Sequence, residues 1–143
     1  MANDRPLTML LLACYFKGER FMKRAHERGA KLHLLTQERL REKAWPHEQL
    51  DGFFAQMNDP PLRATINTVT YMMRTILFDR IVGLDDFDVE TAAALREHLR
   101  LPGMGESLAR FFRDKLACRV KCREVGIPVP EFTPVFNNDE VAE

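Results

Sequence analysis

The chain has 143 residues, a length typical of one domain, and it excludes a multi-domain enzyme. Its residues are 45% hydrophobic and 29% charged, which is ordinary for a globular protein with a core and excludes a wholly disordered chain. The 21 basic and 21 acidic residues balance, so the composition argues against a protein that binds nucleic acid through overall positive charge. It does not exclude a local basic patch.

The apolar segments and the cysteines indicate the compartment. The longest apolar run, residues 7–16, is shorter than the about 20 residues that a membrane span requires, and no small-residue cleavage site follows it. Three cysteines, Cys14, Cys118 and Cys122, give no closed disulfide framework. The last two would share a helix face, but zinc prefers four ligands and none lies nearby in sequence. We therefore expect a cytoplasmic protein with reduced thiols, no metal centre and no membrane partner.

The first third of the chain predicts a β-α-β unit. Residues 9–13 form a continuous apolar run, typical of a strand buried on both faces of a parallel sheet. Residues 14–18 then predict a loop, residues 19–28 an amphipathic helix ended by Gly29, and residues 31–35 a second strand. The right-handed crossover of such a unit makes its two strands parallel.

The middle of the chain is less regular. Residues 36–61 form a polar passage punctuated by prolines, in which Leu50, Phe53 and Phe54 predict a small apolar cluster on a helical turn. Residues 62–78 predict a helix, because apolar side chains recur there at three- and four-residue steps.

A further strand and helix follow. Residues 79–84 predict a third strand that ends in Asp85-Asp86, and Asp88 suits the N-cap of a helix over residues 89–99. This alternation of strands and helices predicts an α/β fold with a three-layer, Rossmann-like parallel sheet.

The last part of the chain predicts a long helical stretch over residues 106–125. We expect a break near Arg113, because Asp114 is a suitable N-cap for a second helix, and Gly126 would end that helix. Residues 131–136 predict an extended segment and residues 137–143 a polar tail.

The predicted fold indicates where a ligand would bind. In open parallel sheets, ligands bind beyond the carboxyl ends of the strands, near the switch in strand order. Lys17 and Arg20 could hold an anionic substrate there, and Asp85 and Asp86 could hold Mg²⁺, although an exposed helix start and a solvated loop explain the same residues. We take these four as candidate substrate-binding residues.

Other chemical signals are weak. The first turn lacks the G-x-G-x-x-G pattern, so a standard dinucleotide site is not expected. Gly103 and Gly105 precede a helix and could cradle a phosphate, but a connecting turn explains them better. No nucleophile arrangement of serine or cysteine with histidine stands out, so no catalytic residue and no metal ligand is assigned.

Two motifs in the last third of the chain resemble a known family. The run Arg113-Asp114-Lys115, followed by Gly126-Ile127-Pro128-Val129-Pro130, resembles the start of the ATP-grasp domain in ATP-grasp ligases. Upstream, residues 79–86 with an alanine-rich helix, and Leu101-Pro102-Gly103, are similar to the N-terminal, pre-ATP-grasp domain of these enzymes. Relatives include the carbamoyl phosphate synthase large chain, biotin carboxylase and amino-acid ligases. The resemblance covers most of the chain and is most specific over residues 79–136.

The resemblance implies an ATP-dependent carboxylate ligase. Such enzymes use ATP with Mg²⁺ to make an acyl phosphate, which a nucleophile, often an amine, then attacks. Residues 1–112 would be the pre-ATP-grasp α/β domain, and residues 113–143 the linking helix and strand at the start of the ATP-grasp domain. Lys115 matches the basic position that reaches the ATP phosphates, and Arg113 matches less closely, so both are candidate ATP-binding residues.

The family pattern is incomplete in this sequence. The glycine-containing loop, the second lysine and the Mg²⁺ ligands of the family do not follow Phe136. We therefore expect a truncated chain that carries the substrate-side scaffold with part of the ATP site, and that alone shows weak or absent ATP binding and no turnover.

Two alternatives stay open. The first is a non-catalytic interaction or oligomerisation module of α/β fold, with a homodimer as one outcome. A truncated chain would expose apolar surface where the next lobe packs, and the candidates for that surface are Phe111, Phe112, Val135 and Phe136. The second is a small nucleotide-binding regulator with its site at the strand ends, which the missing glycine signature disfavours.

Overall fold

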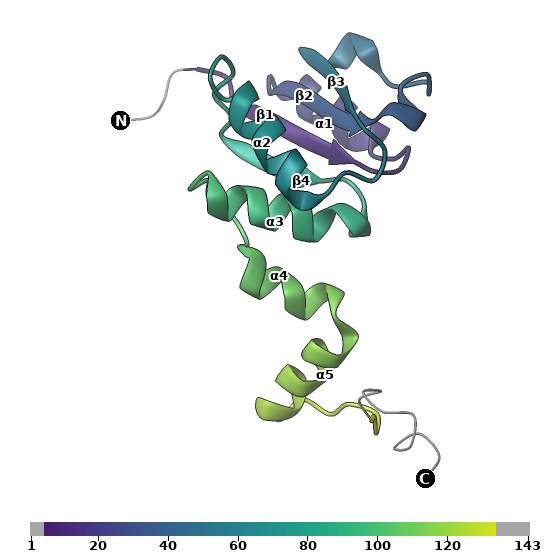
Figure 1. The fold of residues 1–143 in the computed structure, drawn as a ribbon, viewed down its shortest axis with the longest axis vertical. Coiled ribbons are helices and arrows are strands. Elements are labelled where there is room, and N and C mark those ends of the chain that lie inside the picture. Colours follow the sequence, from purple (N-terminus) through teal and green to yellow (C-terminus); the bar gives the residue numbers. More distant parts are fainter. Residues whose placement is uncertain (1–4, 134–143) are drawn as a thin grey trace.

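A four-stranded, all-parallel sheet forms the centre of the protein (Figure 1). The computed structural model describes residues 5–133. The strands lie in the order β3-β2-β1-β4, and their bounds are β1 Thr8–Ala13, β2 Lys31–Gln37, β3 Gly52–Gln56 and β4 Arg80–Gly83. The predicted strands near residues 9–13, 31–35 and 79–84 are therefore confirmed as β1, β2 and β4.

Helices cover both faces of the sheet and make the predicted three layers. On one face, α2 (Leu62–Met72) and α3 (Val89–His98) pack on a core that contains Leu10, Leu12 and Leu35. On the other face, α1 (Glu19–Glu27) packs on a core that contains Leu11 and Leu34. Neighbouring residues of β1 thus serve opposite cores, which is why its sequence is continuously apolar.

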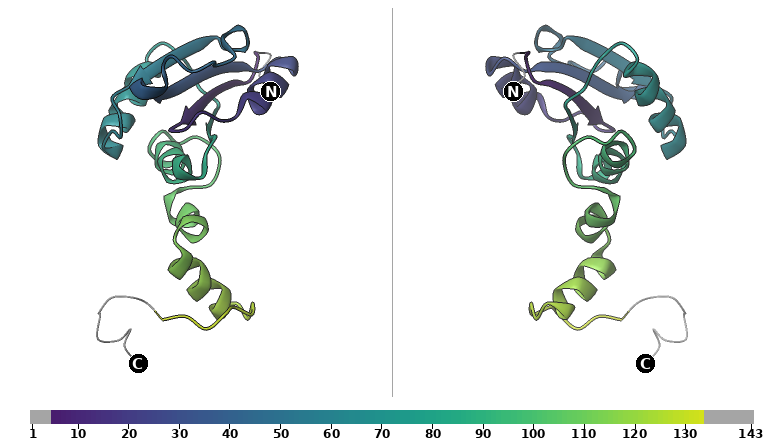
Figure 2. Two further views of the ribbon diagram at one scale, coloured as in Figure 1. Left: turned by 90° about the vertical axis from the view of Figure 1, so that its right-hand side faces the viewer. Right: turned by 90° about the vertical axis from the view of Figure 1, so that its left-hand side faces the viewer.

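Two further helices lead away from the sheet. Figure 2 shows α4 (Glu106–Arg113) and α5 (Lys115–Glu124) continuing below α3, on the side remote from the sheet. The break predicted near Arg113 is confirmed: the Asp114 carboxylate accepts hydrogen bonds from the backbone N–H groups of Leu116 and Ala117 and so caps α5. Gly126 follows α5 in a left-handed conformation, with φ of 76°.

Three local predictions are wrong. Phe53 and Phe54 lie on the edge strand β3 and not on a helical turn, since β3 pairs in parallel with β2. The helix predicted over residues 62–78 ends at Met72, and the chain continues as turns before β4. Asp88 precedes α3, but its side chain makes no cap to that helix; it binds the ends of β1 and β4 instead.

The remaining segments are short. Single 3₁₀ turns are η1 (Glu38–Leu40) and η2 (His47–Gln49) after β2, and η3 (Asp86–Asp88) after β4. Among residues 5–133, no helix is both long enough and apolar enough to cross a bilayer. Residues 134–136 of the predicted extended segment over 131–136, and the whole tail 137–143, lie outside the described residues.

Candidate functional site

The candidate site lies where the strand order of the sheet switches. From β1 the chain crosses first to β2 and β3 on one side, and then returns to β4 on the other side of β1. Loops that leave β1 and β4 therefore diverge at the carboxyl edge of the sheet, and such a divergence opens a crevice for ligands. The loop after β1 carries Cys14 to Gly18, and the turn after β4 carries Asp85 to Asp88.

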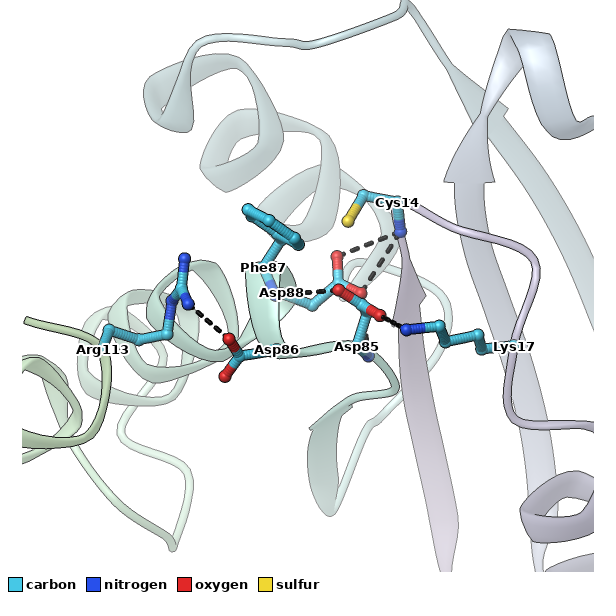
Figure 3. Close-up of polar contacts among 7 residues, drawn as sticks. All are labelled: Cys14, Lys17, Asp85, Asp86, Phe87, Asp88 and Arg113. Carbon is cyan, nitrogen blue, oxygen red and sulfur yellow. Dashed lines mark hydrogen bonds and ion pairs between the residues drawn. The ribbon is translucent and has the colours of Figure 1, made fainter.

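Two buried aspartates hold these loops together (Figure 3). Both Asp88 carboxylate oxygens accept from the Cys14 backbone N–H, at 3.1 and 3.2 Å, and Oδ2 also accepts from the Asp85 N–H at 3.2 Å. The Asp85 carboxylate in turn accepts from the Phe87 N–H at 3.0 Å. The ends of the neighbouring strands β1 and β4 are thus tied by side chains as well as by the sheet.

Two ion pairs at this edge of the sheet involve charged residues that the sequence analysis singles out. The Lys17 ammonium binds the Asp85 carboxylate, and the Arg113 guanidinium binds Asp86 (Figure 3). The hydrogen bond from Lys17 and that from the Phe87 N–H lower the pKa of Asp85, and the same Lys17 contact raises the pKa of Lys17. Each cation is already neutralised by an aspartate of the same turn.

An aromatic side chain, Phe87, packs against the Arg113–Asp86 pair. The Arg113 guanidinium lies 4.9 Å from the centre of the Phe87 ring, and that ring lies 5.5 Å from the ring of Tyr15. The buried Arg113 Nε has no hydrogen-bond partner among the described residues. Through Phe87 and Asp86, the end of α4 is therefore fixed to the turn that follows β4.

The thiol at this edge is not prepared for nucleophilic attack. Burial, and then the neighbouring Asp88 carboxylate, raise the pKa of Cys14 to about 12. A thiol attacks as its thiolate, so Cys14 is inert at neutral pH. Burial likewise raises the pKa of Asp88, against the opposing effect of its backbone hydrogen bonds.

A cavity of about 310 Å³ opens beside this turn. It lies at the carboxyl ends of β1, β2 and β3, on the face that α2 and α3 cover. Its polar wall contains Thr36, Gln37, Gln56, Thr65 and Thr91, and Tyr15, Phe87 and Asp88 close the side toward the ion pairs. The volume is at the lower end of the range for ligand pockets, which favours a small ligand or one end of a larger one.

The structure thus brings together Lys17, Asp85, Asp86 and Arg113 and separates the other two candidates from them. Arg20 lies exposed on α1, and Lys115 lies exposed at the start of α5; neither forms an ion pair within residues 5–133. Sequence reasoning missed the polar wall of the cavity. The signal for it is the position of Gln37 and Gln56 as the last residues of two adjacent strands, but the sequence pattern does not predict β3.

The start of α5 and the acidic side chains are the places where ATP and a metal ion could be bound. The Asp114 side chain occupies the N–H groups of Leu116 and Ala117 at the start of α5, and the Lys115 side chain is exposed beside them. No cluster of three or more metal-ligating side chains occurs in residues 5–133. Among the described residues, Lys115 is thus an exposed cation at a helix start, and no ready set of Mg²⁺ ligands is present.

Comparison with solved structures confirms the fold resemblance to ATP-grasp ligases. No protein-family profile and no curated protein matches the chain. One similar structure is an L-amino acid ligase from Bacillus licheniformis, with a TM-score of 0.79 at 16% sequence identity. The superposition covers 92% of this chain and 32% of the ligase chain. A phosphoribosylglycinamide synthetase from Anaerococcus prevotii matches 96% of this chain and 34% of its own, with a TM-score of 0.64 at 15% identity.

The biotin carboxylase domain of a thermophilic 2-oxoglutarate carboxylase is a third neighbour. It matches 87% of this chain and 29% of its own, with a TM-score of 0.62 at 15% identity. The chain thus spans about a third of the length of these proteins. At such identities the likeness establishes the fold: an α/β, Rossmann-like domain of the kind found in ATP-grasp ligases.

Proposed function

We propose that this chain is the N-terminal domain of an ATP-dependent carboxylate ligase and supplies its substrate side with part of the ATP site. The observation that carries the proposal is the shared fold over 92% of the chain, together with an exposed Lys115 at the position that the sequence motif assigns to the ATP phosphates. ATP, with Mg²⁺, would supply the phosphoryl group that activates the carboxylate. The domain boundary proposed from sequence, residues 1–112 and 113–143, falls at the end of α4.

The two proposed ATP contacts differ in readiness. Lys115 is exposed and has no ion-pair partner within residues 5–133, so its ammonium can approach a phosphate without breaking a contact. Arg113 would have to exchange Asp86 for a phosphate oxygen, and its stacking on Phe87 would hold the guanidinium in place meanwhile. We therefore rank Lys115 first.

The proposed substrate side is the carboxyl edge of the sheet. Lys17, Asp85 and Asp86 border it, and the cavity opens next to Asp88. Arg20 lies two residues into α1, where it could meet an anionic part of a substrate outside the cavity. We also propose a cytoplasmic location, which the free thiols of Cys14, Cys118 and Cys122 fit.

The contact of Lys115 with the ATP phosphates can be tested by affinity labelling. The reagent is an acyl-phosphate derivative of ATP, which acylates lysines that lie near the bound phosphates. With the full chain we expect Lys115 to be labelled preferentially, as mapped by mass spectrometry, and excess Mg-ATP to suppress the labelling. Lys121 is the matched control, because it lies on the same helix and is exposed, but pairs with Glu124.

A variant pair gives the second readout. Because this chain carries only part of the ATP site, its binding of Mg-ATP is expected to be weak, and the titration uses millimolar Mg-ATP. Lys115→Met should weaken this binding by about tenfold, the usual effect of losing one charge-assisted hydrogen bond. Lys121→Met should leave binding unchanged. Equal labelling of both lysines, or equal affinity of both variants, would refute the proposed role of Lys115.

An exposed apolar surface favours a second candidate, a non-catalytic interaction module. Phe112 on α4 is 71% exposed, and Leu108, one turn earlier, is 53% exposed. Of the other residues predicted for this surface, Phe111 is half-buried, while Val135 and Phe136 lie outside the described residues. Light scattering tests this: a homodimer that Phe112→Ser disrupts would favour the module, and a monomer at high concentration would oppose it.

A further inference from the structure

The cavity at the carboxyl edge of the sheet carries hydrogen-bond donors that the protein does not use. Gln37 is the last residue of β2, is 7% exposed and lines the cavity. Its Oε1 accepts a hydrogen bond from the Asp59 backbone N–H at 3.1 Å. A backbone N–H can only donate, so this contact fixes the carboxamide orientation and leaves the Gln37 NH₂ group as the free end.

A second carboxamide lies beside the first. Gln56 is the last residue of β3 and is the register partner of Gln37, so both side chains leave the sheet on the same face. The Gln56 Oε1 accepts from the Thr65 hydroxyl at 3.2 Å. Within residues 5–133, neither NH₂ group donates to a protein acceptor. Two amide donors at adjacent strand ends favour a ligand that presents carbonyl-type oxygen atoms.

The charges around the cavity are already satisfied. Arg39 donates to the Asp59 carboxylate at 2.8 Å, and these two residues are an opposite pair at the rim. The Asp88 carboxylate is occupied by the N–H groups of Cys14 and Asp85. No described residue that lines the cavity is a cation without a carboxylate partner, so a phosphate dianion would find no compensating charge and would meet Asp88.

We propose that this cavity binds a small uncharged group whose carbonyl oxygen accepts hydrogen bonds from Gln37 and Gln56, such as a carboxamide, and that it excludes phosphate esters. In naming that group as part of the ligase substrate, the inference rests on the proposed function. The substrate would then enter with an uncharged amide-bearing end in the cavity and its reacting carboxylate outside it.

Amide-detected NMR with the full chain tests the proposal without ATP. The probe is N-acetylglycinamide, and ribose 5-phosphate is the anionic comparison. At millimolar N-acetylglycinamide we expect saturable shifts of the side-chain NH₂ signals of Gln37 and Gln56, and no saturable shift of these signals with ribose 5-phosphate.

Isosteric variants locate the binding. Gln37→Glu keeps an oxygen for the Asp59 N–H and loses the free donor, so it should weaken binding by about tenfold. Gln56→Glu likewise keeps an oxygen for the Thr65 hydroxyl and loses the NH₂ donor. Because Gln56 is less buried, this variant replaces Gln37→Glu in the test if the latter fails to fold. Gln49→Glu, the same change in η2 outside the cavity, is the control and should bind normally.

Three results would overturn the inference: no saturable shift with N-acetylglycinamide, stronger binding of ribose 5-phosphate at the same residues, or normal binding by both cavity variants. The ATP-probe experiment on Lys115 is independent of all three. Failure here with preferential labelling of Lys115 would leave the proposed function standing, and the reverse pattern would leave a binding cavity in a protein of another function.

Discussion

Replacement of Asp88 by alanine probes the contact that joins the two central strand ends. The Asp88 side chain is the acceptor for the N–H groups of Cys14 and Asp85, and the residue is 6% exposed. Alanine would leave both donors without a partner, at about 1–3 kcal/mol each. Removal of a carboxylate whose pKa is raised by burial returns part of this cost. We expect a net loss of about 2–4 kcal/mol, or roughly 10 °C in melting temperature.

The assay is urea unfolding followed by the fluorescence of Trp45, the single tryptophan, which is 4% exposed. Asp86→Ala is the matched control: it removes a carboxylate from the same turn, but that side chain is 68% exposed and serves one ion pair. Its loss should cost less than about 1 kcal/mol. If Asp88→Ala folds with wild-type stability, or if the control costs as much, the account of this turn is wrong.

Three further predictions concern stability. Burial lowers the pKa of His33, whose Nδ1 has no partner within residues 5–133, so the unfolded chain binds a proton more readily than the folded chain. The contribution of His33 to the free energy of unfolding should therefore be complete above about pH 6.5 and be lost as the pH falls below that value. The urea midpoint, measured from pH 7 to pH 5, should then decrease less in His33→Leu than in the wild-type protein. Asp114→Ala removes the cap of α5 and should speed hydrogen exchange in that helix alone, while Asp114→Ser should restore most of the protection. Gly83→Ala would place Cβ 3.0 Å from the backbone of Asp88 and should lower the melting temperature by several degrees, whereas Gly126→Asn, in open space after α5, should change it little.

The parts of the fold that the sequence predicts are those with a local physical cause. Continuous apolar runs predict β1 and β2, because their residues are buried in the cores on the two faces of the sheet. The cap at Asp114 and the left-handed Gly126 predict the limits of α5, since each acts within its own turn. These features depend on residues that are close in sequence.

The parts that the sequence missed depend on distant partners. Strand β3 is short, lies at the sheet edge and is only half-buried, so Phe53 and Phe54 give no alternating or continuous apolar pattern of useful length. Its pairing with β2 places Gln56 beside Gln37, 19 residues earlier in the chain. A prediction that omits β3 does not bring the two carboxamides together, and so it does not predict the polar wall of the cavity.

The same distance problem changes the meaning of the predicted charged residues. Asp85 and Asp86 are adjacent in sequence, yet one binds Lys17 in the loop after β1 and the other binds Arg113 at the end of α4. A phosphate that reached either cation would compete with an aspartate already in contact, whereas one that reached Lys115 would displace no protein group within the described residues. The turn after β4 is therefore better suited to fixing α4, and with it the start of α5, against the sheet. Under the proposed function, Asp86 and Arg113 would then also hold Lys115 in position, and Asp86→Asn should weaken the labelling of Lys115 without altering amide binding in the cavity.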